Sequence, residues 1–215
     1  MPERTIRDRL REEYFDLLPE IRRVAWQLET EIRYHTRHIL RGLKSHEQLV
    51  IKSRVKTCES ALFTIAREEE KRKEDRRIEG RVFDPDRPSD YSMLNLPDLA
   101  GVRALVFPSN TLLEVDQTLR RRFSHWISKP VKDEHGVELA SKYFGYCRQA
   151  SRRVRGEYQV VPMLLGLFWE VEHSAKYKFR DAESSQELRG HRAKVHSALS
   201  RFERGIEEFA RKSPL

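Results

Sequence analysis

Cysteine and long apolar runs are both scarce in this chain of 215 residues. It has only two cysteines, Cys58 and Cys147, too few for a disulfide framework and without metal-type spacing. No apolar run approaches the roughly 20 residues that cross a bilayer, and the first residues lack the apolar segment of a signal peptide. We therefore expect a cytoplasmic protein with no membrane partner.

The signatures of several enzyme classes are also missing. The sequence contains no G-x-S-x-G nucleophile motif, no glycine-rich Walker loop and no G-x-G-x-x-G fingerprint. These absences argue against a serine hydrolase, a P-loop nucleotidase and a Rossmann dehydrogenase.

Charge is what the chain has in abundance. Charged residues make up 35% of it, hydrophobic residues 38%, and the formal net charge is +8. The length and the lean apolar content fit one domain with helical appendages. The positive charge favours polyanionic partners such as nucleotides or RNA.

Apolar periodicity predicts strands that alternate with helices. Short runs rich in β-branched residues at 49–56, 101–107 and 154–161 predict strands, and helical spacing recurs between and around them. This order predicts an α+β fold, with a mixed sheet flanked by helices. The expected segments are an N-terminal helical part (1–44), a central domain (45–180) with a charged, proline-containing insertion (67–97), a long loop with at most a short strand (128–153) and a C-terminal helix (181–215).

Cations gather on one face of the first predicted strand. Alternation places Lys52, Arg54 and Lys56 together, opposite Ile51 and Val55. Arginine forks onto phosphate oxygens and lysine supplies a point charge, so this face could bind phosphates. A basic, solvent-exposed strand face is an equally good interpretation of this segment alone.

Two carboxylates stand at or near the other predicted strands. Glu157 shares a strand face with Arg155 and Gln159, and Asp98 precedes the strand that carries Arg103. If these strands are neighbours, Asp98 and Glu157 converge beside the cations and can hold Mg²⁺ through oxygen ligands. Structural ion pairs are the alternative for each residue taken singly.

Together these motifs resemble the synthetase domain of the RelA/SpoT homologues, in its small alarmone synthetase form. The resemblance covers roughly residues 45–180 and implies that the mixed sheet is nucleotidyltransferase-like. It rests on the following series in the family's order: Arg54-x-Lys56-x-x-x-Ser60, Asp98-Leu-Ala-Gly-Val-Arg103, Gly145-Tyr146, Glu157-x-Gln159 and Glu172-His173-x-x-x-Tyr177-Lys178.

The resemblance implies a magnesium-dependent pyrophosphokinase that moves the β,γ-diphosphate of ATP to the 3′-hydroxyl of GDP or GTP. Asp98 and Glu157 would be the catalytic and metal-binding residues. Four residues would bind ATP and its phosphates, namely Arg54, Lys56, Ser60 and Arg103. The acceptor nucleotide would be bound by Tyr146, through stacking, and by Gln159.

Two other functions stay open from the sequence. A basic stretch at Arg148, Arg152, Arg153 and Arg155 suits a toxic relative that modifies the 3′ end of tRNA, or one that modifies adenine nucleotides. A non-catalytic nucleotide-binding or partner-binding module is the third possibility. No DNA partner is expected, whereas a homo-oligomer or an antitoxin partner is compatible with the terminal helices.

Overall fold

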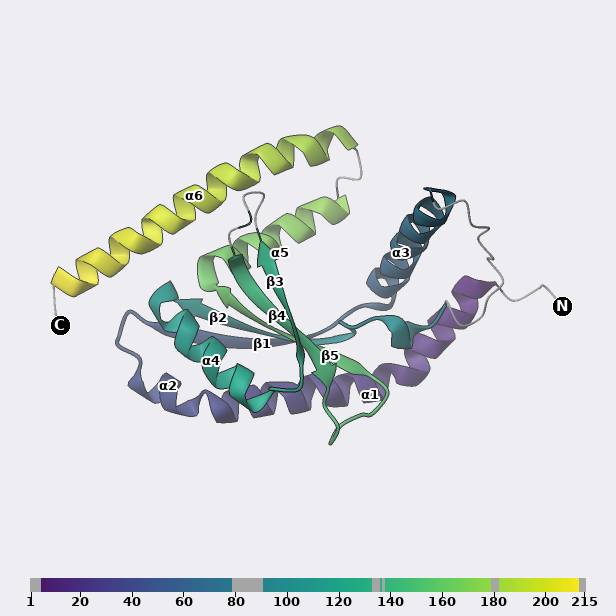
Figure 1. Cartoon of the computed structure of the whole chain (residues 1–215), viewed down its shortest axis with the longest axis horizontal. Coiled ribbons are helices and arrows are strands. Elements are labelled where there is room, and N and C mark those ends of the chain that lie inside the picture. The colour runs from purple at the N-terminus through teal and green to yellow at the C-terminus, as the bar shows by residue number, and fades with distance from the viewer. Residues whose placement is uncertain (1–4, 79–90, 133–135, 137, 179–181, 213–215) are drawn as a thin grey trace.

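The computed structural model describes residues 5–78, 91–132, 136, 138–178 and 182–212, which form a mixed sheet with helices on both faces (Figure 1). The elements in chain order are α1 (Ile6–His35), α2 (Arg37–Gly42), β1 (Gln48–Val55), α3 (Cys58–Ile78), η2 (Met93–Asn95), β2 (Ala100–Phe107), η3 (Ser109–Thr111), α4 (Leu112–Arg122), β3 (Ile127–Lys132), β4 (Glu138–Tyr146), β5 (Arg155–Pro162), α5 (Met163–Lys178) and α6 (Ala182–Lys212).

The strands lie in the order β1-β2-β5-β4-β3. Strands β2 and β5 are parallel, and the other neighbouring pairs are antiparallel. The three strands predicted from the sequence are therefore confirmed as β1, β2 and β5, and they are direct neighbours. The predicted α+β class is confirmed as well.

One face of the sheet forms the main core. Apolar residues of α1 and α4 pack on it, against the buried residues Val102, Ala104 and Val106 of β2 and Tyr158 and Val160 of β5. Leu28 and Ile32 of α1 and Leu119 of α4 have no exposed surface. The long helix α1 is thus held by the sheet along its apolar stripe.

The opposite face is apolar only at one end. There α5 covers a small cluster that includes Leu105, Val161 and Leu165. Helix α6 runs alongside α5 in Figure 1, and its Glu203 accepts a hydrogen bond of 2.7 Å from the Ser109 hydroxyl. The other end of this face, toward α3, carries polar side chains.

Two sequence-based expectations need correction. Most of the predicted loop at 128–153 is a hairpin, β3 and β4, whose outer strand is mostly exposed and therefore shows no buried pattern. Pro130 fits there because an edge strand tolerates a missing N–H. The charged stretch from Arg67 continues α3 to Ile78. Of the remaining part of that predicted insertion, residues 79–90 lie outside the described residues, and residues 91–97 contain the short helix η2.

None of the helices in the described part of the chain combines the length and the apolar character that a membrane span needs.

Candidate active site

Strand register sets the polar side chains in two rows across the sheet. Glu157 of β5 lies opposite Gly101 of β2 and Phe144 of β4, and Gly101 in turn lies opposite Arg54 of β1. Two residues along, a second row runs through Lys52, Arg103, Gln159 and Lys142. Because alternate strand residues share a face, both rows point to the same side of the sheet.

Asp98 is fixed beside two cations at the end of β1. The Lys56 ammonium donates to both Asp98 carboxylate oxygens, at 2.9 and 2.8 Å, and the Arg54 guanidinium lies 3.9 Å away. The backbone holds this arrangement, since the Lys56 N–H donates to the Leu99 carbonyl at 2.9 Å. A side chain at Gly101 would contact Arg54 at 3.3 Å, so the glycine gives the arginine room to lie across β2.

Glu157 is almost fully buried, with 4% of its surface exposed. Burial raises the pKa of this carboxyl, and the positive charge of Lys142, whose ammonium lies 4.0 Å from Oε1, opposes the rise. The negative charge of Asp98 adds to the rise in the pKa of Glu157. The Gln159 side-chain amide donates a short hydrogen bond to Glu157.

A chain of contacts extends from Glu157 to α5. The Arg103 guanidinium donates to the Gln159 side-chain oxygen at 3.2 Å and to Glu170 at 3.4 Å. Glu170 also accepts from the Lys52 ammonium at 3.3 Å. Burial lowers the pKa of Arg103, and the charge of nearby Arg54 lowers it further. Glu170 thus helps to hold Arg103, which in turn contacts the residue that orients Glu157.

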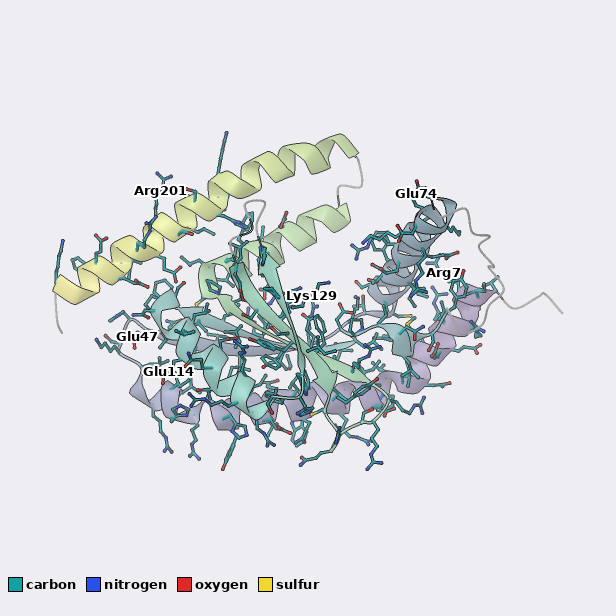
Figure 2. The ribbon with its side chains drawn as sticks, viewed as in Figure 1. Arg7, Glu47, Glu74, Glu114, Lys129 and Arg201 are labelled. Carbon is teal, nitrogen blue, oxygen red and sulfur yellow. The ribbon has the colours of Figure 1, made fainter. Side chains whose placement is uncertain are left out.

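Asp98 and Glu157 open into one cavity of about 580 Å³. It lies between α3 and η2 on one side and the β3–β4 hairpin on the other. Lys129, one of its lining residues, stands between the sheet and α3 in Figure 2. The remaining lining residues are Thr64, Ile65, Arg67, Glu68, Glu69, Arg72, Tyr91, Ser92, Asn95, Leu96, Pro97, Pro130, Val131, Lys142 and Phe144.

Of the predicted site residues, Asp98 and Glu157 line the cavity. They are joined by direct or indirect contacts to Arg54, Lys56, Arg103 and Gln159. The other two predicted residues lie at the margin of the site. Ser60 is in the first turn of α3, and the described lining of the cavity has Thr64, one turn later, in its place. Tyr146 is 40% exposed and lines a neighbouring pocket of about 360 Å³ with Arg148 and Arg152.

Several site residues were not predicted. Lys142 and Phe144 come from β4, which the sequence analysis placed in a loop, and Glu170 reaches the cations from α5. The adjacent aromatic residues Tyr143 and Phe144 were the available sequence signal for β4, because aromatic residues are enriched in strands. The side chains of His173, Tyr177 and Lys178, which contributed to the resemblance, lie outside what the structure describes.

The donor set at the cavity suits a hard divalent cation that also binds phosphate. Mg²⁺ is usually held by one or two carboxylates, with substrate phosphates and water completing the shell. Asp98 and Glu157 meet this requirement. Within the described ranges no group of three or more histidine, cysteine or acidic residues forms a site made wholly of protein ligands.

The chain resembles known proteins in its structure and not detectably in its sequence. No protein-family model and no curated protein sequence matches the chain. Small alarmone synthetase 1 from Bacillus subtilis bound to its product pppGpp superposes with a TM-score of 0.64 at 15% identity, covering 95% of this chain and 100% of that one. The fold is that of the small alarmone synthetases.

Two further solved structures of small alarmone synthetases also superpose on this chain. The same Bacillus subtilis enzyme bound to AMPCPP gives a TM-score of 0.61 at 14% identity over 94% of this chain and 100% of that chain. Small alarmone synthetase 2 from Bacillus subtilis gives a TM-score of 0.54 at 17% identity, over 89% of this chain and 97% of that chain. These likenesses extend over nearly the whole chain, so the terminal helices belong to the shared architecture.

Proposed function

We propose that the protein is a magnesium-dependent pyrophosphokinase that transfers the β,γ-diphosphate of ATP to the 3′-hydroxyl of GDP or GTP. The observation that carries the proposal is the meeting of Asp98 and Glu157 in one cavity, with Arg54 and Lys56 paired to Asp98. The similar structures bound to an ATP analogue and to pppGpp support these nucleotides as substrates.

Glu157 has the environment of a general base. The 3′-hydroxyl oxygen attacks the β-phosphorus, the bond from that phosphorus to the α–β bridging oxygen breaks, and AMP leaves. The hydroxyl proton passes to the Glu157 carboxylate. Burial raises the pKa of Glu157, which makes it a stronger base than an exposed glutamate, and the Gln159 amide holds it in one orientation.

Arg54, Lys56 and Arg103 are assigned to the phosphates of ATP. Phosphoryl transfer depends mainly on positioning and on cations that neutralise charge, so three cations beside the carboxylates suit it. Each of them is held by a carboxylate, Arg54 and Lys56 by Asp98 and Arg103 by Glu170. Phosphate oxygens would replace these carboxylates as partners when ATP binds.

Asp98 and Glu157 would hold the magnesium ion. When bound, the ion would supply charge neutralisation on the phosphate oxygens.

The hairpin side of the cavity is assigned to the acceptor nucleotide. Lys129 and Lys142 lie opposite each other on β3 and β4 and offer two cations to the acceptor phosphates. Phe144 presents an aromatic surface in the same cavity. Tyr146 lies on the same strand face two residues beyond Phe144, so a base could stack on it from the neighbouring pocket.

The test is a transfer assay with purified protein, ATP labelled on the γ-phosphate and Mg²⁺. GDP, GTP, AMP, ADP and deacylated tRNA are offered in separate reactions, and label in each acceptor is measured. The proposal predicts label in the guanine nucleotides and its loss when Glu157→Gln replaces the wild type. Label found only in tRNA or in adenine nucleotides contradicts the proposed acceptor, and label found in no acceptor contradicts catalysis.

A further inference from the structure

The two charged residues that meet at the end of β1 both lie outside the strands. Lys56 belongs to the short connection between β1 and α3, and Asp98 precedes β2. The ladder between β1 and β2 ends at the pair of Val55 and Ala100, so it includes neither of them. Contacts from elsewhere in the molecule must therefore hold the Lys56–Asp98 pair in place.

The buried side chain of Tyr14, in α1, fixes the backbone of Lys56. Its hydroxyl donates to the Lys56 carbonyl at 2.7 Å, and the Lys56 N–H donates to the Leu99 carbonyl at 2.9 Å. Both backbone polar groups of Lys56 are thus satisfied while its ammonium contacts Asp98. Burial raises the pKa of Tyr14, so the hydroxyl keeps its proton and remains a donor.

The preceding residue of α1, Glu13, fixes the segment that leads to Asp98. The Ser92 hydroxyl donates to the Glu13 carboxylate, and so does the Met93 N–H, at 3.1 Å. These contacts lie at the start of η2, and the two residues between η2 and Asp98 both line the cavity. Glu13 therefore anchors the wall of the cavity that carries Asp98.

Adjacent residues of one helix thus hold both members of the Lys56–Asp98 pair. Successive helical residues point about 100° apart, which lets Glu13 and Tyr14 reach two different segments. The later turns of α1 are packed on the sheet in the main core, so the helix provides a fixed frame for both contacts.

Exposed ion pairs add to the contact between α1 and α3. The first turns of α1 extend beyond the sheet and lie beside α3 in Figure 1. There Arg7, which Figure 2 labels, and Arg11 donate to Glu59 at 3.0 and 2.7 Å. Ion pairs this exposed contribute little. The contacts of Glu13 and Tyr14 are better shielded from water, and they reach the site directly.

We propose that Tyr14 and Glu13 are positioning residues of the candidate active site, which hold Lys56 and Asp98 in the geometry that binds ATP with its metal ion. This role rests on the proposed function. Neither residue is part of the described lining of the cavity, so each acts through the segment that it holds. Phosphoryl transfer depends mainly on positioning, and a small displacement of the reacting groups is costly.

The first test is Tyr14→Phe, which removes the hydroxyl and keeps the buried ring. Binding of AMPCPP with Mg²⁺ is measured by isothermal titration calorimetry, and the transfer assay gives KM for ATP and for GDP. We expect the affinity for AMPCPP to fall roughly tenfold and KM for ATP to rise by a similar factor. KM for GDP should be unchanged, because the acceptor side of the cavity is formed by the β3–β4 hairpin.

Tyr143→Phe is the matched control. This buried tyrosine also loses one hydrogen bond, to Asp116 on the apolar side of the sheet. Both variants should lower the melting temperature, but only Tyr14→Phe should weaken AMPCPP binding. A lower melting temperature with wild-type AMPCPP affinity in Tyr14→Phe would show a purely structural role and overturn the proposal. An equal rise in KM for ATP and for GDP would overturn it as well.

Glu13 gives a second test that does not depend on the first variant. Glu13→Ala removes the acceptor for Ser92 and Met93 and should weaken AMPCPP binding about fivefold, whereas Glu13→Gln keeps an oxygen acceptor and should restore most of the affinity. Asp16→Ala removes an exposed acid from the same helix and should match the wild type. Equal losses in Asp16→Ala and Glu13→Ala would mean that charge alone matters, which overturns the role of Glu13.

Binding of AMPCPP requires neither an acceptor nor transfer, so this proposal and the proposed function fail separately. A protein that binds AMPCPP but labels no acceptor contradicts the transfer reaction, and its loss of AMPCPP affinity in Tyr14→Phe would still support the positioning role. Wild-type AMPCPP affinity in both Tyr14→Phe and Glu13→Ala would overturn the positioning role even where transfer to GDP is observed.

Discussion

The two faces of strands β2 and β5 use the same backbone for different purposes. Toward α1 and α4 they present Val102, Ala104, Tyr158 and Val160, all buried in the main core. Toward α5 the intervening positions include Arg103, Glu157 and Gln159. Glu157 and Gln159 are as deeply buried as many core residues, at 4% exposed each.

Burying a carboxylate costs free energy unless its partners compensate. The raised pKa of Glu157 shows that compensation by Lys142 and its other partners is incomplete. The apolar face thus contributes stability, and the polar face keeps a group that folding alone would not favour. Substitutions on the two faces should therefore separate activity from stability.

The largest effect is expected for Glu157→Gln. The amide keeps the shape and can still accept from Gln159, but it cannot take a proton, so transfer should fall at least about 100-fold. Thermal stability should be unchanged or higher, because a carboxyl with a raised pKa disfavours the folded state at neutral pH. Transfer rate and melting temperature measured together check this, and a strongly lowered melting temperature would contradict it.

Two stacked tyrosines provide the matched experiment on the apolar side of the sheet. Tyr143 and Tyr158 have ring centroids 4.5 Å apart, but only Tyr143 has a hydrogen-bond partner among the described residues, donating to the buried Asp116 at 2.6 Å. Tyr143→Phe should lower stability by about 1–3 kcal/mol, and Tyr158→Phe should leave it unchanged or raise it slightly. Urea unfolding measures both, and equal effects would contradict the assignment. Neither variant should change the transfer rate.

The pH dependence of transfer should report the environment of Glu157. Activity needs the deprotonated carboxylate, so the rate rises with pH through its pKa and then levels off. The charge of Lys142 lowers this pKa. In Lys142→Ala, the acidic limb of the pH–rate profile, where the rate rises with pH, should therefore move to higher pH. Lys129→Ala removes another lysine from the cavity and should leave the limb in place. A shift toward lower pH in Lys142→Ala would contradict the role of Glu157 as the base.

A smaller effect is expected for Glu170→Gln. The substitution weakens the contacts to Lys52 and Arg103, which in turn contacts Gln159. Because Glu170 is half exposed, the loss should be less than about tenfold and should appear mainly in KM for ATP. Glu114→Gln, on the exposed side of α4, is the control and should match the wild type. A loss as large as that of Glu157→Gln would contradict the indirect role.

The sequence predicts the part of the fold that is buried. Strands β1, β2 and β5 have strong apolar patterns, and alternation along them correctly placed Arg54, Arg103 and Glu157 on one face. The hairpin of β3 and β4 escaped prediction because the outer strand is exposed and Pro130 and Gly136 suggested a loop. Lys142 and Phe144 were missed with it.

Contacts between elements were harder to predict than strands. The position of Glu170 depends on how α5 crosses the sheet, which local patterns do not encode. The continuation of α3 to Ile78 depends on charged side chains that pair along the helix, such as Lys73 with Glu69 at 2.9 Å. A run of mixed charge therefore hid a helix where no apolar stripe marked it.

Asp98 and Glu157 are expected to act as one unit on one substrate pair. Transfer from labelled ATP to GDP should be measured for Asp98→Asn, Glu157→Gln and the double variant, with nucleotide binding measured in parallel. Residues that act as a unit give a double variant little worse than the poorer single variant, and this is the expected result. Independent, additive losses, or a single variant with wild-type transfer, would contradict the account.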